Sequence, residues 1–394
     1  MRICVLPLVL MLGLSAVTDA PALDWPWKSW RKSGAGVQRA PRISIATFSG
    51  ATGASAEHSL REELMNAGEL LPVAQGEEAA HSMTASSVGG RVTARLADKK
   101  GKEVFERTYA APGLDENVKA LADDIIYAIT GRPGLATSQI AFVSDASGRK
   151  QIYLCDANGE NIRQVTNDPY GAVSPSLSAD ASLLVYTTYR SGFASVQMLD
   201  LAGGHERVLS DTPGGGTGAA ISPDSQRVAM TLGFVGTPEI FVTDVTSGDT
   251  ICISETTGAP SGPAWHPKEP LVMFSCDEGK GPGLWIATMR KDDTAKPWRT
   301  WHSFCTDPEW SPDGTQVAFT AGSGGSYCVV VKDYPSGRSH VIKRGGAQHP
   351  TWSPNGRFIA YAQSGRLFVH DLKTGDQRAL VTNLGSISEP RWMR

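Results

Sequence analysis

The chain has 394 residues, of which 20% are charged, and 37 Lys and Arg residues against 40 Asp and Glu residues leave a net charge of −3. This balance does not favour binding to nucleic acid or to an anionic membrane surface. The 42 glycines and 24 prolines are typical of a turn-rich chain.

Residues 1–22 have the pattern of a secretory signal peptide. Arg2 supplies a minimal basic start, and Ile3–Ala16 is an apolar stretch that is too short for a membrane span. Two cleavage sites compete, one after Ala16 and one at Ala20-Pro21-Ala22. We therefore expect an exported protein without direct membrane insertion; an anchor retained at the N-terminus is the alternative.

Residues 23–41 combine three tryptophans with basic residues and then a Ser-Gly-Ala-Gly stretch, without helical or strand periodicity. We interpret them as a flexible N-terminal arm. A docking segment is the alternative.

Residues 42–134 predict a small α/β domain, with mixed strands and two helices. Strand-like alternation and helical stripes that end at glycine carry this prediction. The predicted strands are 42–48, 72–74, 91–97 and 103–109, and the predicted helices run from Ser55 to Gly68 and from Asp115 to Gly131. Residues 76–90 are assigned no element.

One turn motif recurs along the second half of the chain. Trp310-Ser311-Pro312-Asp313-Gly314 returns as Trp352-Ser353-Pro354-Asn355-Gly356, and weaker copies place equivalent anchor residues at 178, 222 and 266. The five anchors are separated by 44, 44, 45 and 42 residues. A period in the low forties with four strand-like runs per unit is typical of a β-propeller.

The two ends of the repeat region complete each other. Residues 139–165 supply three strands of a blade, and residues 389–392 supply only the first strand of one. Joining them would remove two free sheet edges. Residues 138–394 are therefore predicted to form a six-bladed propeller closed by pairing of 389–392 with 138–144.

The repeats also predict structural roles for several polar and aromatic residues. The turn residues Asp180, Asp224, Asp313 and Asn355 are expected to cap their own turns. The repeated tryptophans 265, 310, 352 and 392 are interpreted as core residues rather than ligand platforms. Five cysteines follow the signal, and free buried thiols are favoured over one disulfide. Neither the cysteines nor the eight histidines show metal-ligand spacing, so no metal or cofactor is expected.

The chain resembles the TolB family, the soluble periplasmic component of the Tol–Pal envelope system, over residues 42–394. The marks of the resemblance are the 45–48 strand, the helix segment 60–68, Thr130-Gly131-Arg132-Pro133-Gly134 leading into Ile140–Val143, and the Trp-Ser-Pro-Asp-Gly repeats. Segments 23–32 and 76–90 depart from the family pattern.

This resemblance implies a non-enzymatic, periplasmic and monomeric scaffold that supports outer-membrane integrity and cell division. Its implied partners are a Pal-like peptidoglycan-associated lipoprotein, held at one mouth of the propeller channel, and inner-membrane Tol proteins, reached through the N-terminal segment. The family's partner-contacting positions lie just before the first strand of a blade. They correspond here to Gly215, Gly216, Thr217, Gly218, Ser261, Gly262 and Pro263 and, by analogy, to Asp307, His349 and Glu389.

An exported propeller enzyme, such as a polysaccharide lyase or a hydrolase acting in the central channel, is the alternative. It would need several titratable side chains that converge on the channel. Glu309, Glu389 and Arg391 keep this hypothesis open, although no catalytic residue is assigned.

Overall fold

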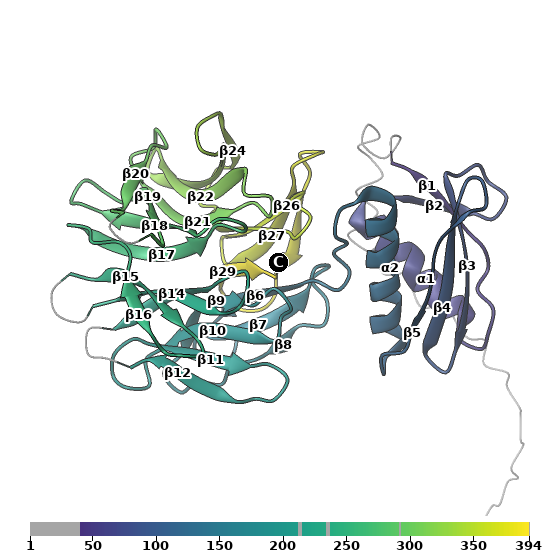
Figure 1. The fold of residues 1–394 in the computed structure, drawn as a ribbon, viewed down its shortest axis with the longest axis horizontal. Coiled ribbons are helices and arrows are strands. Elements are labelled where there is room, and N and C mark those ends of the chain that lie inside the picture. Colours follow the sequence, from purple (N-terminus) through teal and green to yellow (C-terminus); the bar gives the residue numbers. More distant parts are fainter. Residues whose placement is uncertain (1–39, 212–214, 234–236, 291–292, 394) are drawn as a thin grey trace, which may run out of the picture.

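The computed structural model describes residues 40–211, 215–233, 237–290 and 293–393. They form a small α/β domain beside a six-bladed β-propeller, which confirms the predicted fold class. In Figure 1 the two helices lie between the small sheet and the propeller. The predicted signal peptide and residues 23–39 of the predicted arm lie outside the described residues. No helix in the described ranges is long and apolar enough to cross a membrane.

The α/β domain is built from a five-stranded mixed sheet and two helices, α1 (Gly53–Ala67) and α2 (Leu114–Thr130). The strand order is β2-β1-β3-β4-β5, with β1 parallel to β2 and β3. The strands are β1 (Arg42–Ile45), β2 (Leu71–Ala74), β3 (His81–Val88), β4 (Arg91–Asp98) and β5 (Glu103–Tyr109). The expected helical stripes, among them Leu60, Leu64, Val118 and Leu121, are buried in its core.

Strand β3 was not predicted, because it carries only two buried side chains, Met83 and Ser87, among polar neighbours. Its hydrogen bonds to β1 and β4 override its weak apolar pattern. The expected N-caps were also wrong. Helix α1 is capped by Thr52 and α2 by Gly113, neither with a side-chain hydrogen bond.

Six four-stranded antiparallel sheets form the propeller, and we number the blades along the chain. Blade 1 contains β29 (Ile387–Trp392), β6 (Gln139–Ser144), β7 (Gln151–Asp156) and β8 (Arg163–Gln164). Blade 2 contains β9 (Ala172–Leu177), β10 (Leu183–Thr188), β11 (Ser195–Asp200) and β12 (Glu206–Ser210), and blade 3 contains β13 (Gly216–Ile221), β14 (Arg227–Leu232), β15 (Glu239–Asp244) and β16 (Thr250–Cys252). Blade 4 contains β17 (Ala259–Trp265), β18 (Leu271–Asp277), β19 (Gly283–Thr288) and β20 (Lys296–Trp298). Blade 5 contains β21 (Cys305–Trp310), β22 (Gln316–Ser323), β23 (Ser326–Asp333) and β24 (Ser339–Lys343), and blade 6 contains β25 (Gln348–Trp352), β26 (Phe358–Gln363), β27 (Arg366–Asp371) and β28 (Gln377–Val381).

The C-terminal strand β29 pairs antiparallel with β6, so the last strand of the chain is the innermost strand of blade 1. Ile387 lies opposite Ser144, and Trp392 lies opposite Ile140. The Trp392 indole N–H donates to the Ser138 hydroxyl, at 3.0 Å. In Figure 1 this strand lies beside β6. Strand β6 therefore has no unpaired edge where the propeller closes.

The repeated turns are held by local side-chain hydrogen bonds. The Ser311 hydroxyl donates to Asp313 at 2.6 Å and accepts from the Gln316 amide at 2.9 Å. The same pattern occurs at Ser178, Ser222 and Ser353. At the third turn in chain order, in blade 4, His266 replaces serine, and its Nδ1 accepts from the amides of Lys268 and Glu269. These bonds explain why the motif keeps one spacing.

The α/β domain is joined to the tight-turn face of the propeller by Arg357. This side chain is 5% exposed and forms ion pairs with Glu69 at 3.1 Å and with Asp371 at 2.7 Å. Its guanidinium also donates to the Gly68 carbonyl, at 2.8 Å, beyond the end of α1. A second buried contact joins Lys119 of α2 to Asp156 at 2.8 Å. The two contacts attach the α/β domain to blades 6 and 1.

The linker between the domains is itself fixed. The Asp123 carboxylate accepts from the amides of Ala136 and Thr137, at 2.8 and 2.9 Å. A Cβ on Gly134 would lie 2.0 Å from Asp123 Oδ1, so this position requires glycine. Glycine at position 134 thus allows the linker to pack closely against α2.

A cavity of about 30 Å³ lies between the domains and is lined by Glu63 of α1 and Arg378 of blade 6, among others. Burial raises the pKa of the Glu63 carboxyl to about 7. The nearby carboxylates of Asp115, Asp123 and Glu160 add to the shift, and Lys119 opposes it. Glu63 is therefore partly protonated at neutral pH in the folded protein.

We expect Arg357→Ala to lower the free energy of unfolding by about 3–5 kcal/mol, because it leaves Glu69 and Asp371 buried without their shared partner. Urea denaturation measures this loss. Arg366→Ala, which removes an exposed arginine of the same blade, is the matched control. Equal stability of the two variants would contradict the assigned role of Arg357.

We expect Glu63→Gln to raise the Tm at about pH 8 and to leave it nearly unchanged at about pH 4. The folded-state pKa, about 7, exceeds the ordinary value of 4.5. Ionisation of Glu63 therefore lowers stability as the pH rises through this window, and glutamine removes that loss. Thermal unfolding across the pH range measures the difference. Glu62→Gln, on the exposed neighbouring residue, is the control; the same pH-dependent gain there would refute the explanation.

Candidate protein-binding site at the channel mouth

The innermost strand of every blade contains a bulge with one residue in the left-handed region. These six residues have φ values between 52° and 60° and are Ser174, Gly218, Gly262, Asp307, His349 and Glu389. The pairing to the second strand shifts register at each of these places. Four of the six are not glycine, and a left-handed residue with a Cβ costs about 1–2 kcal/mol. The bulge therefore holds this conformation at the same place in every blade, despite its cost at the four residues with a Cβ.

The six residues line one cavity of about 280 Å³ in the central channel. Each belongs to a different blade, so the cavity lies where the six inner strands meet. We call it the channel mouth. It is lined by Ser174, Pro175, Ser176, Thr217, Gly218, Ala219, Ala220, Ser261, Gly262, Pro263, Ser275, Asp307, His349, Glu389 and Arg391.

Polar side chains occupy four positions in the ring of left-handed residues, and glycines occupy the other two. The Glu389 carboxylate accepts from the Ser174 amide at 2.7 Å and from its hydroxyl at 3.1 Å. Asp307 and His349 of adjacent blades approach to 3.8 Å. On the remaining side, a Cβ on Gly218 would lie 3.3 Å from the Gly262 amide nitrogen. The two glycines therefore leave backbone accessible opposite charged and hydroxyl side chains.

A second cavity, of about 270 Å³, continues the channel toward the α/β domain. It shares Ser176, Ala220, Pro263 and Arg391 with the channel mouth, and it is also lined by Pro133 of the linker. Because the linker lies at this end, the channel mouth is on the opposite face, among the loops that join consecutive blades. That face does not carry the Arg357 and Lys119 contacts to the α/β domain.

Glu309 and Glu389, the glutamates on which the enzymatic alternative depends, accept hydrogen bonds from neighbouring blades. The Glu309 carboxylate accepts from the Thr351 hydroxyl at 2.9 Å and from the Trp352 amide at 3.3 Å. Glu389 is held by Ser174, as described above. Arg391 lies 3.9 Å from Glu309. Within the described ranges, no three His, Cys, Asp or Glu side chains are grouped to hold a metal ion.

Eight of the ten predicted partner-binding residues line the channel mouth: Thr217, Gly218, Ser261, Gly262, Pro263, Asp307, His349 and Glu389. Gly215 and Gly216 do not. Gly216 is buried against Val196 and Leu232. The eight were expected in loops ahead of the inner strands. All eight lie within those strands instead, since each strand begins before its bulge.

The structure adds Ser174 and Arg391 to the mouth. Ser174 was detectable in the sequence, because each left-handed residue of blades 2 to 6 stands four positions before the anchor residue of its turn, and 174 precedes 178. Arg391 was expected in the channel only as part of the enzymatic alternative, and no repeat position placed it at the mouth.

Comparison with known proteins agrees with this architecture. The family model described as the TolB beta propeller domain matches residues 127–394. Two curated relatives are named "Tol-Pal system protein TolB". The protein from Chromobacterium violaceum is 39% identical over 80 residues, which is 19% of this chain and 19% of the relative. The protein from Hydrogenovibrio crunogenus is 31% identical over 90 residues, which is 22% of this chain and 21% of the relative.

The crystal structure of TolB from Acinetobacter baumannii is similar in fold. It covers 90% of this chain and 97% of its own, with a TM-score of 0.75 and 21% sequence identity. The curated sequence matches span about a fifth of each relative, whereas the family model spans most of this chain. On the strength of that model, the chain belongs to the TolB β-propeller domain family.

Proposed function

We propose that this protein is a non-enzymatic scaffold of a Tol–Pal-type envelope system. It is exported to the periplasm and holds the globular domain of a Pal-like peptidoglycan-associated lipoprotein at the channel mouth. Through this contact it supports outer-membrane integrity and cell division. Contact with inner-membrane Tol proteins is assigned to the N-terminal segment.

The observation that carries this proposal is the ring of six left-handed residues around the mouth. Six blades converge on it, so a partner docked there touches all of them. The ring offers exposed backbone at Gly218 and Gly262 and polar side chains at Asp307, His349 and Glu389. Such a rigid, mixed surface suits recognition of another protein.

The position of the mouth supports the same reading. The α/β domain occupies the tight-turn face, through Arg357 and Lys119. The loop face is thus left for a partner. The engaged carboxylates of Glu309 and Glu389 weigh against the lyase or hydrolase alternative, since a channel enzyme needs carboxylates directed at substrate.

We expect Ser261→Arg to weaken capture of a lipoprotein globular domain at least about 30-fold, which corresponds to about 2 kcal/mol. Ser261 is exposed at the mouth, and a long charged side chain there would occupy the docking space. The measurement is biolayer interferometry with the soluble domain of the peptidoglycan-associated lipoprotein from the same organism.

Two further variants sharpen the experiment. Asp307→Gly removes one polar side chain and suits the left-handed backbone, so it should weaken capture without loss of Tm. Ser339→Arg, on an exposed serine of the outer strand β24, is the matched control and should bind normally. Normal capture by folded Ser261→Arg and Asp307→Gly proteins would refute the proposed site.

A further inference from the structure

Exposed aromatic residues gather on the loop face of the propeller. In the described part of the propeller, the exposed large aromatic side chains are Tyr170, Tyr189, Trp301 and Tyr327. All four lie in or beside loops that join blades or join the second and third strands of a blade. The exposed large aliphatic residues Ile162, Val208, Ile251 and Val341 lie instead on outer strands or on the tight-turn side. Aromatic residues are the side chains most enriched in protein interfaces.

Trp301 stands out among them. Its side chain is 84% exposed, and its φ is 66°. A bulky residue in the left-handed region is a genuine outlier, and an indole left in water contributes nothing to the core. Neither its conformation nor its exposure is explained by the fold of the isolated chain.

The segment around Trp301 is anchored on both sides. Thr300 is buried; its hydroxyl lies 3.1 Å from Cys305 Sγ and accepts from the His302 amide at 3.4 Å. The Phe304 carbonyl accepts from the Gly322 amide at 3.0 Å, and its ring packs on Tyr327 at 5.4 Å. The backbone on both sides of Trp301 is therefore anchored, and the indole is exposed to solvent.

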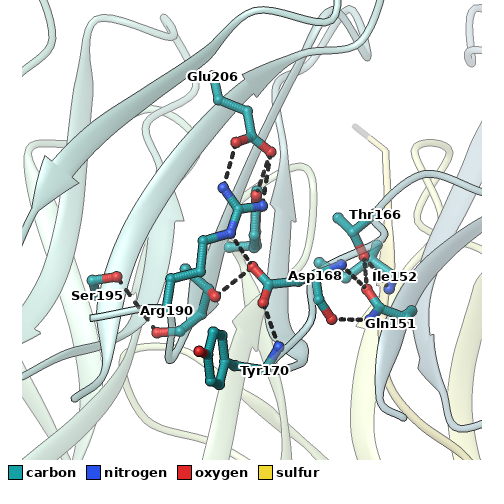
Figure 2. A network of polar contacts seen from close by, with 10 residues as sticks. Gln151, Ile152, Thr166, Asp168, Tyr170, Arg190, Ser195 and Glu206 are labelled. Atoms are coloured by element: carbon teal, nitrogen blue, oxygen red, sulfur yellow. Dashed lines mark hydrogen bonds and ion pairs between the residues drawn. The ribbon is translucent and has the colours of Figure 1, made fainter. Parts of the chain in front are cut away.

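The backbone at the two exposed tyrosines, Tyr170 between blades 1 and 2 and Tyr189 of blade 2, is anchored in a similar way. Figure 2 shows Asp168 at the centre of a polar network between blades 1 and 2. Its carboxylate accepts from the Tyr170 amide at 2.8 Å, from the Thr188 hydroxyl and from Arg190 Nε. Arg190 also pairs with Glu206, at 2.6 Å. Tyr189 lies between two residues bound to the same carboxylate, so both tyrosine loops are preorganised.

An ordinary interface is wide enough to contain both Trp301 and the channel mouth. A specific protein complex buries about 800 Å² on each partner, which is a disc roughly 32 Å across. Trp301 is six residues before Asp307, so its Cα lies at most about 22 Å from the mouth residue, even along a fully extended chain. The mouth cavity, about 280 Å³, admits only a few side chains. A folded partner seated there must extend onto the surrounding loops.

We propose that Trp301 is an anchor residue of the lipoprotein interface and lies outside the channel mouth itself. This inference rests on the proposed function. Blades 2 and 5 face each other across the six-membered ring, so the tyrosine pair and the Trp301–Tyr327 pair flank the mouth on opposite sides. The partner would offer an apolar pocket to the indole, and the tyrosines would supply the opposite rim.

The test measures binding of the lipoprotein soluble domain to the mature full-length protein by biolayer interferometry. We expect Trp301→Ala to weaken binding at least about ten-fold. Trp301→Gly, which suits the positive φ, should lose binding equally while its Tm stays level or rises. Val208→Ala and Ile251→Ala, on outer strands, are matched controls and should bind as wild type.

The outcomes separate the two proposals. If Ser261→Arg loses binding but both folded Trp301 variants bind as wild type, Trp301 is not an anchor residue, and the channel mouth remains supported as the docking site. If Ser261→Arg and both Trp301 variants all bind as wild type, the proposed function itself fails. Loss of binding at Trp301 alone would support the anchor and overturn the mouth as the docking centre.

Discussion

The antiparallel pairing of β29 with β6 is the contact on which the rest of the molecule depends. It joins strands from the two ends of the propeller and completes blade 1. Without it, two sheet edges would be exposed, and the inner strands would have no fixed curvature. The pairing also brings Glu389 beside Ser174, which closes the ring of left-handed residues. The channel mouth is therefore a product of closure, since no single blade contains it.

The propeller uses its two faces for different contacts. The tight turns, held by the Ser–Asp bonds of the repeat, lie on the face that contacts the α/β domain. Buried ion pairs of Arg357 and Lys119 form this attachment. The loop face carries the varied residues, the cavity and the exposed aromatics. The domain attachment and the proposed binding surface thus lie on opposite faces of one scaffold.

Much of this architecture was predictable from the sequence, because it is repeated. The turn spacing indicated blades, and the complementary remnants at 139–165 and 389–392 indicated six of them. Eight mouth residues followed from the resemblance and their place ahead of each turn. Features that depend on three-dimensional context were not predictable. The left-handed backbone at Asp307 and His349 has no compositional sign, since such residues usually adopt ordinary conformations.

The contacts between the two domains were equally unpredictable from the sequence. Arg357 and Gly68 are 289 positions apart, and nothing in a turn arginine indicates a buried ion pair. Strand β3 was missed because its neighbours, rather than its own apolar pattern, stabilise it. The exposure of Trp301 was also missed, because sequence alone does not distinguish a tryptophan held in solvent from one in a core.

The Arg357 contact has a consequence for the chain terminus. Arg357 belongs to blade 6, whereas Glu69 belongs to the α/β domain, whose linker leads into β6 of blade 1. The Lys119–Asp156 ion pair joins the same domain to blade 1. Blades 6 and 1 are therefore connected twice, directly through β29 and indirectly through the α/β domain. Chain ends normally fray first, but if β29 frays, the α/β domain still holds the two blades that it joins.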